Sequence, residues 1–429
     1  MLGILELACP TIGAINGLSL FKINQIKPIF ANALKRHLEE FENRVETVML
    51  EQYTAIHPTI RWRFREAAIQ ILDRGNKGGK DDEIIFENLY PFYGSLDVRN
   101  SSIKRNAAVL RDLLDNLEAS CELLRKGHDI LSLSILDELV YEVEQRLESL
   151  RGDITKGDET ELADFITKKI NPVIDHLGQQ YPRVKDEVKL YQEKICTDSG
   201  IFTNHRLAYD DELIKINSCI VNCLEEEEIA LQELVPCLFE KFKTDGVEYN
   251  IYLGNSIAPR NVFDPLHIDN LRLRQLIWTC KIMRTINDMN ICATEEENKS
   301  MDDIMPTKIL EIAPVILAYG TPITLKFRMD EKQLDVDGSY NVRYEILKKR
   351  IDKSYIQNTE ERLSQPGHLA VVYMHEEEAI AYRRHFNYLA FQGYIHSDWS
   401  VYELESLPGA EGLRAIRAKV NMQYSGDYH

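Results

Sequence analysis

Three aspartates in the last third of the chain form the pattern best suited to holding a metal ion: Asp330, Asp335 and Asp337. The Asp-x-Asp-Gly order that begins at Asp335 partly matches a calcium-binding loop, but its twelfth position is Ile346, where a bidentate glutamate is needed. A magnesium site that uses these aspartates with Arg328 is one interpretation. A polar loop joining a strand to a helix is the other. We assign no metal and no catalytic residue, and keep these four side chains as candidates for ligand or partner binding.

A basic segment follows the aspartates and could bind a phosphate group or an acidic partner. Residues 343–353 carry five basic side chains against two acids, in a chain that is otherwise acidic. We single out Lys348, Lys349 and Arg350 as candidate binding residues. An exposed amphipathic helix has the same composition, so both interpretations stay open.

Motifs for nucleophilic catalysis and nucleotide binding are absent from the sequence. It contains no Gly-x-Ser-x-Gly elbow, P-loop, His-Glu-x-x-His pair or dinucleotide fingerprint. Eight cysteines are scattered along the chain, and only Cys219 and Cys223 lie close together. No second pair follows at the spacing of zinc ligands. We interpret the cysteines as reduced core thiols of a cytoplasmic protein and expect no cofactor.

Composition and charge narrow the class of protein. The 429 residues include 51 lysines and arginines against 69 acids, a formal net charge of −18. This balance argues against general nucleic-acid binding, which needs a positive surface. The sequence has no run of eighteen apolar residues and no signal peptide, so we expect a cytoplasmic protein without nucleic-acid or membrane partners. Its length predicts two or three domains.

The N-terminal part predicts a short strand followed by a long helical segment. Residues 3–7 are β-prone, and a helix-forming run extends from Leu20 to about Leu72, with a break at 54–58. Within this run the apolar residues follow heptad spacing. They are Leu34, Leu38, Phe41, Val45 and Val48. This pattern favours either a parallel homodimer seam or a helix packed on its own protein.

The middle of the chain predicts mainly helices. Residues 85–102 are expected to form a packed, irregular segment. Within it, Asp97 and Arg99 either face a ligand together or form a salt bridge that fixes the loop. Residues 102–243 read as a helical bundle of four or five helices. A polar, acidic stretch at 293–304 is the expected linker.

The C-terminal part predicts a small α/β domain. The expected strands are 322–329, 368–374 and 400–407, and the expected helices are 340–353 and 376–391, with a short helix after Gly409. Together the segments predict a mainly α protein with an N-terminal orphan strand, a long signalling-type helix, a central bundle and this terminal domain.

Several segments resemble a group of large bacterial GAF-domain-containing sensory proteins. They are residues 3–7, 27–36, 53–58, 90–102, 243–248, 327–338, 348–353 and 361–367. The resemblance implies that residues 1–20 are the last strand and exit loop of a GAF-like domain that lies mostly upstream. Residues 21–75 would be a connecting helix, 76–292 a bundle, and 305–421 the α/β domain.

The function expected from these patterns is non-enzymatic signal transduction, in which a helix relays the ligand state of a GAF-type sensor to the downstream modules. One alternative is a metal-dependent enzyme of unknown type that uses the C-terminal aspartates. A second alternative is a structural scaffold that binds other proteins through its loops and its basic helix.

Overall fold

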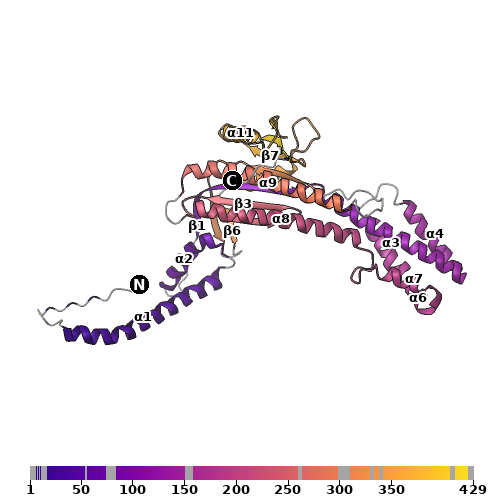
Figure 1. Cartoon of the computed structure of the whole chain (residues 1–429), viewed down its shortest axis with the longest axis horizontal. Helices are drawn as coiled ribbons and strands as arrows, with labels where there is room; N and C mark the ends of the chain where they lie inside the picture. Colours follow the sequence, from indigo (N-terminus) through magenta and orange to yellow (C-terminus); the bar gives the residue numbers. More distant parts are fainter. Residues whose placement is uncertain are drawn as a thin grey trace.

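The protein is described by a computed structural model that covers residues 6, 8, 10, 17–53, 56–73, 84–149, 158–258, 263–297, 310–328, 333–337, 342–405 and 411–423. The elongated molecule has a sheet at its centre, with α1 extending from one end and a helical arm from the other (Figure 1). The strand expected at 3–7 lies outside these residues, apart from Glu6, which is not in a strand. Of the linker expected at 293–304, residues 293–297 belong instead to the helix α9 (Pro265–Glu297), and the rest lies outside the described residues.

Two helices form an N-terminal hairpin, a name we use for α1 (Gly17–Gln52), η1 (Pro58–Ile60) and α2 (Arg61–Asp73). The chain leaves α1 just before the predicted break, because the residue before a proline avoids the helical region. Arg61 and Arg65 of α2 form ion pairs with Glu46 and Glu42 of α1. Both pairs lie on the exposed side of the hairpin, so they add little to its stability.

The strands of the described residues form one mixed, nine-stranded sheet, with the order β2-β3-β1-β4-β7-β9-β8 and a β5–β6 hairpin attached to β1. The strands are β1 (Ile85–Val98), β2 (Leu238–Lys243), β3 (Val247–Leu253), β4 (Ile312–Leu317), β5 (Ile323–Arg328), β6 (Gln333–Asp337), β7 (His368–Tyr373), β8 (Ser400–Glu403) and β9 (Arg414–Lys419). β4 and β7 pair in parallel, and the other pairs are antiparallel. The expectation of a mainly α protein is therefore wrong: the fold is α/β.

The central strand β1 was expected to be irregular because it contains Pro91 and Gly94, which usually weaken a strand. Pro91 lies between Leu89, where pairing with β5 ends, and Tyr93, where pairing with β4 begins. Its missing N–H therefore falls where β1 changes neighbours. At Gly94 a side chain would collide with the ring of Tyr249, so only glycine leaves room for that ring. Both breakers have local reasons that sequence patterns do not reveal.

The sheet also contains strands from two segments that were predicted to be separate domains. β1, β2 and β3 come from the segment expected to be a pure helical bundle, and β1 pairs directly with β4 of the C-terminal segment. β4 and β6 were not expected, and β9 occupies the position where a short helix was predicted after Gly409. β6 contains Asp335 and Asp337, so this stretch is a strand rather than a polar loop.

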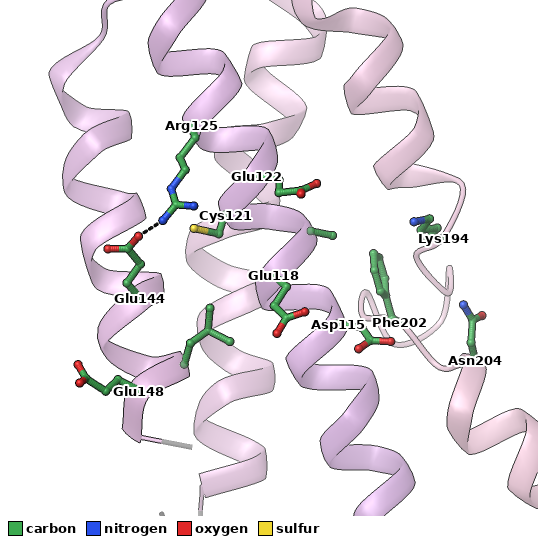
Figure 2. A pocket seen from close by; sticks show the side chains of 12 residues that line it. Asp115, Glu118, Cys121, Glu122, Arg125, Glu144, Glu148, Lys194, Phe202 and Asn204 are labelled. Atoms are coloured by element: carbon green, nitrogen blue, oxygen red, sulfur yellow. Dashed lines mark hydrogen bonds and ion pairs between the residues drawn. The ribbon is translucent and has the colours of Figure 1, made fainter. Parts of the chain in front are cut away.

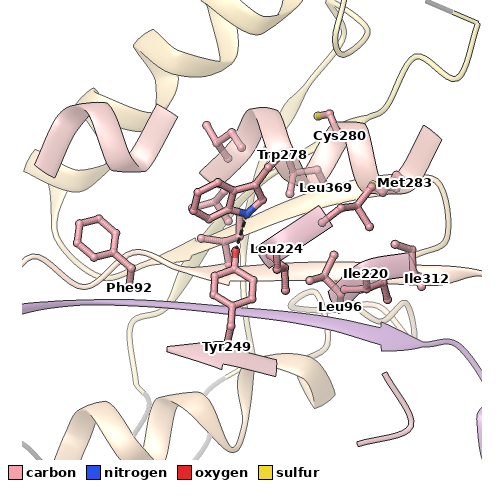
Figure 3. Packing of buried hydrophobic residues seen from close by; sticks show 14 of the residues in the cluster. Phe92, Leu96, Ile220, Leu224, Tyr249, Trp278, Cys280, Met283, Ile312 and Leu369 are labelled. Atoms are coloured by element: carbon pink, nitrogen blue, oxygen red, sulfur yellow. Dashed lines mark hydrogen bonds between the residues drawn. The ribbon is translucent and has the colours of Figure 1, made fainter. Parts of the chain in front are cut away.

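One face of the sheet packs under α8 (Asn204–Leu234), α9 (Pro265–Glu297) and α11 (Glu376–Phe391). In this first core, the Trp278 indole N–H of α9 donates a hydrogen bond of 3.2 Å to the Tyr249 hydroxyl (Figure 3). The side-chain amide of Gln275, also on α9, donates a second one of 3.1 Å. Burial raises the pKa of Tyr249 to about 12. The hydroxyl therefore stays protonated and its two donors are satisfied, as a buried polar group requires.

The opposite face packs against the N-terminal hairpin, the β5–β6 hairpin and α10 (Val342–Lys348). This second core is centred on three aromatic rings. Phe64 lies 5.0 Å from both Tyr53 and Phe327, measured between ring centroids, and Tyr53 lies 5.4 Å from Phe327. Such edge-to-face contacts add specific attraction to the apolar burial. They join the helical hairpin to the sheet.

The helical arm has a core of its own. It consists of α3 (Ser101–Leu131), α4 (Ser134–Ser149), α5 (Asp158–Phe165), η2 (Ile166–Ile170), α6 (Asn171–Gln180), η3 (Pro182–Val184) and α7 (Lys185–Gln192). α3 and α8 connect this arm to the sheet, and the arm lies at the end of the molecule opposite α1 (Figure 1). Outside the arm, the 3-10 turn η4 (Ile351–Lys353) follows α10.

Two further expectations concern thiols and membranes. The cysteines of the described residues are free. Cys121, Cys237 and Cys280 are buried, as expected of core thiols, whereas Cys196, Cys219 and Cys223 are only half-buried. Within the described part of the chain, no helix has the length and apolar character needed to cross a bilayer.

Candidate functional site

A pocket of about 640 Å³ lies between the N-terminal hairpin and the second face of the sheet. We call it the hairpin pocket. Its walls come from η1 and α2, from the edge strand β2 and its neighbour β3, from the β5–β6 hairpin and from α10. A pocket of this size between packed elements is typical of small-molecule sites.

A row of polar side chains crosses the sheet beneath this pocket. Glu240 of β2 is directly opposite Asn250 of β3, and Asn250 is directly opposite Tyr93 of β1. Residues opposite each other in paired strands point to the same face. The Tyr344 hydroxyl of α10 donates a hydrogen bond of 3.3 Å to Asn250 Oδ1. The register thus places a carboxylate beside a buried amide that is already fixed.

The basic side chain nearest this row is Lys348 of α10. Its ammonium group forms an ion pair of 3.0 Å with Glu345 and lies over the rings of Tyr93 and Tyr344, 5.6 and 5.2 Å from their centroids. Cation–π contacts of this kind favour a fixed ammonium position. Lys348 is therefore already neutralised and anchored by its own helix and the sheet.

The carboxyl group of Glu240 has an altered pKa. Burial raises it to about 6, since the attraction of Lys348 offsets the cost of desolvation only in part and Glu345 adds to the shift. In the described residues, Glu240 has no ion pair or side-chain hydrogen bond. A shielded carboxylate without a partner is unusual and marks the pocket as a candidate binding site.

The remaining charged groups of the pocket are paired. Arg328 of β5 forms an ion pair of 2.8 Å with Asp335 of β6. His57 faces Glu228 at 3.4 Å, yet burial lowers its pKa against that attraction, so the ring is mainly neutral at pH 7. Glu240 is thus the charge in this pocket that its neighbours leave unbalanced.

The structure brings together three of the predicted binding residues and separates the others. Arg328, Asp335 and Lys348 all line the hairpin pocket. Asp337 pairs with Thr324 in the β5–β6 hairpin, and Asp330 lies outside the described residues. No group of three or more potential metal ligands occurs among the described histidines, cysteines and acids.

The other two predicted basic residues lie after α10. Lys349 is exposed, and the carbonyl oxygen of Arg350 accepts a hydrogen bond of 3.1 Å from the Ser354 hydroxyl. Neither belongs to the pocket lining. The basic segment is thus divided, with Lys348 at the pocket and its two neighbours outside it.

A second constellation lies at the end of β1, where Asp97 lies next to the turn between β2 and β3. A side chain on Gly246 would overlap the Leu96 carbonyl oxygen and lie 2.8 Å from Asp97 Cα, so the turn touches the strand. Asp245 of this turn accepts a hydrogen bond of 2.8 Å from the hydroxyl of Ser101, the first residue of α3. The segments that carry Asp97 and Asp245 therefore touch through their backbones, near the N-terminus of α3.

Arg99 follows Asp97 in the turn after β1, where its backbone N–H donates a hydrogen bond of 2.8 Å to Glu311 O. Sequence reasoning selected Asp97 but missed Asp245. The signal that could have found Asp245 is a Thr-Asp-Gly turn between two alternating apolar segments, which predicts a hairpin.

The residues of the predicted dimer seam divide into two groups. Val45 is buried in the second core, and Phe41 and Val48 pack partly against it. Leu34 is half-buried and Leu38 is 42% exposed. The far end of the seam thus contacts its own chain, and the near end remains accessible.

A groove of about 760 Å³ runs along the helical arm between α3, α4 and the start of α8 (Figure 2). Its rim is mainly acidic, with Glu118, Glu122 and Glu148 among the lining residues. Arg125 of α3 reaches across to Glu144 of α4. Because both partners are largely exposed, this pair adds little stability.

Comparison with known proteins gives no family assignment. No family model matches the chain, and no curated protein matches it. The crystal structure of the guanylyl cyclase Cya2 aligns over 50% of this chain and 85% of its own, with 12% sequence identity and a TM-score of 0.27. A TM-score of this size does not establish a common fold, so the similarity carries no argument about function.

Proposed function

We propose that this chain is the output part of a regulatory protein, in which α1 pairs with a second copy and relays its position to the hairpin pocket. The observation that carries the proposal is the division of α1. Its C-terminal part is buried in the second core, while its N-terminal part presents large apolar side chains to solvent.

The exposed part of α1 has the character of an interface. Ile26, Ile29 and Phe30 are 57%, 69% and 64% exposed, and they flank Pro28 within a continuous exposed stretch, residues 26–30. Ile26 and Phe30 continue through Leu34 and Leu38 as one stripe of i, i+4 steps. An apolar stripe on an otherwise polar helix is stable in water only when something covers it. A second α1 in parallel orientation supplies the same stripe.

The buried part of α1 supplies the coupling. Val45 and Met49 pack in the second core with Phe64 of α2 and Phe327 of β5, and the latter two residues also line the hairpin pocket. A rotation or shift of α1 would therefore move the pocket walls, and a ligand in the pocket would favour one helix position. The resemblance to GAF-containing sensory proteins fits this role, with the sensor placed ahead of α1.

We expect Ile26→Asp combined with Phe30→Asp to abolish pairing, because four charges would face each other across the seam of a dimer. Sedimentation velocity should show a dimer for the unaltered chain and a monomer for the variant, with pairing weakened at least 100-fold.

The matched control is Asn24→Asp with Asn32→Asp, which adds the same charges to other exposed positions of the same helix. This control should remain a dimer. A monomeric unaltered chain, or equal effects of the two double variants, would contradict the proposal. Thermal melting confirms that each variant is folded.

A second candidate function is a Mg²⁺- or Mn²⁺-dependent enzyme centred on Asp97 and Asp245. The observation that favours it is the contact between the β2–β3 turn and the end of β1. Mg²⁺ is often held by only one or two carboxylates, with substrate phosphates and water completing the coordination. The metal-dependent alternative therefore moves from the C-terminal aspartates to this pair.

We expect millimolar Mn²⁺ to raise the melting temperature of the unaltered chain by a few degrees, because it would bind the folded form alone. Asp245→Asn should lose this increase, and Asp211→Asn, an exposed acid on α8, should keep it. An increase that persists in Asp245→Asn, or none in the unaltered chain, would exclude a cation site at this pair.

A further inference from the structure

Glu240 identifies the hairpin pocket as a site for a particular class of ligand. Its carboxylate lies on the edge strand β2 within the pocket lining, opposite Asn250, whose side-chain oxygen is occupied by the Tyr344 hydroxyl. Within the described residues, no cation lies within ion-pair distance of this carboxylate. A shielded charge with no protein partner is costly unless a ligand neutralises it.

The charge balance of the pocket predicts the sign of the charge on that ligand. Two lining carboxylates, Asp335 and Glu345, are already paired with Arg328 and Lys348 at 2.8 and 3.0 Å. His57 carries little charge at pH 7 because burial lowers its pKa. One negative charge remains, on Glu240. A ligand with one positive charge would complete the balance.

Much of the remaining pocket lining is apolar. Ile60, Phe64 and Phe327 are almost fully buried in the second core and also line the pocket, together with Leu334 and Val336. Tyr252 of β3, two residues from Asn250, belongs to the same lining. An aromatic and aliphatic lining that includes one unbalanced carboxylate suits a molecule with an apolar body and a cationic end.

We propose that the hairpin pocket binds a small organic amine, whose ammonium group pairs with Glu240 and whose apolar part packs against Phe64 and Phe327. The regulatory meaning of this site rests on the proposed function, whereas the binding itself does not. Because the same two phenylalanines join the N-terminal hairpin to the sheet, an amine held there would stabilise one position of the hairpin.

The test is calorimetric titration of the whole chain at pH 7.5 with three probes of similar shape: 2-phenylethylamine, 2-phenylethanol and 3-phenylpropionate. We expect the amine to bind at least tenfold more tightly than the alcohol, and the carboxylate to bind weakest. Glu240→Gln should weaken amine binding at least tenfold, while Glu226→Gln, an exposed acid on α8, should leave it unchanged.

Three results would overturn the inference: no binding of the amine, equal binding by Glu240→Gln, or preference for the carboxylate, which would indicate an anion site at Lys348. Melting curves establish that both variants are folded, and Glu240→Asp, which keeps the charge, should retain part of the affinity. Sedimentation of the same samples separates the two proposals. Amine binding by a monomeric chain would support the pocket and refute the relay.

Discussion

Replacing Phe64 by alanine should destabilise the protein by about 3–5 kcal/mol, the usual cost of removing a buried phenylalanine side chain. Phe64 is almost completely buried and contacts the rings of Tyr53 and Phe327 at 5.0 Å. These contacts connect the N-terminal hairpin to the sheet, so the variant should lose the docked position of α1 and α2 before it loses the first core. Urea denaturation measures the first effect, and hydrogen exchange of α1 and α2 measures the second.

The matched control for this variant is Phe21→Ala in the exposed part of α1, where the ring is 61% accessible. The monomeric stability of this control should change by less than about 0.5 kcal/mol, as is usual for a surface substitution. If Phe64→Ala were as stable as Phe21→Ala, the hairpin would not be docked through the aromatic cluster.

Glu240 should make the protein less stable as the pH rises from about 4.5 to 6. Its folded-state pKa of about 6 lies above the ordinary value of 4.5, so the folded state binds more protons than the unfolded state in this window. A difference of this size corresponds to about 2 kcal/mol of stability, present below the window and lost above it. Glu240→Gln cannot ionise and should therefore gain about 2 kcal/mol over the unaltered protein on going from pH 4.5 to 7.5.

Urea denaturation at these two pH values measures the gain. Glu226→Gln serves as the control, because that carboxylate is exposed on α8. If Glu240→Gln and the unaltered protein instead differed in stability by the same amount at both pH values, Glu240 would be well solvated. The proposed amine site would then lack the poorly solvated, unpaired charge on which it is based.

The elements that sequence patterns predicted are those whose local signals are strong. α11 begins with an acidic first turn. β5 alternates between apolar and polar residues, and β7 is a nearly continuous apolar run. β1 was missed because Pro91 and Gly94 are explained only by its change of neighbour and by the ring of Tyr249. β2 was missed because only residues 235–237 separate it from α8, and none of them is glycine.

The candidate site was predictable only in part. Arg328, Asp335 and Lys348 were selected for their charge, and the fold gathers them because β5, β6 and α10 all pack on the same face of the sheet. Glu240 and Asn250 could not be selected from the sequence, because their place in the site depends on the strand register that puts them opposite each other. A pairing register across a hairpin is fixed by the turn and the buried face, and composition alone does not reveal it.

Oxidative cross-linking of α1 tests the central claim, that two copies pair through this helix, most directly. Single substitutions Phe30→Cys and Asn32→Cys place a thiol at two exposed positions of one helical turn that face different directions. In a parallel pair, residue 30 meets its counterpart and residue 32 does not. Phe30→Cys should give a covalent dimer far above the background of the unaltered protein, and Asn32→Cys should stay at that background. Equal yields from both positions, or none from residue 30, would contradict the account.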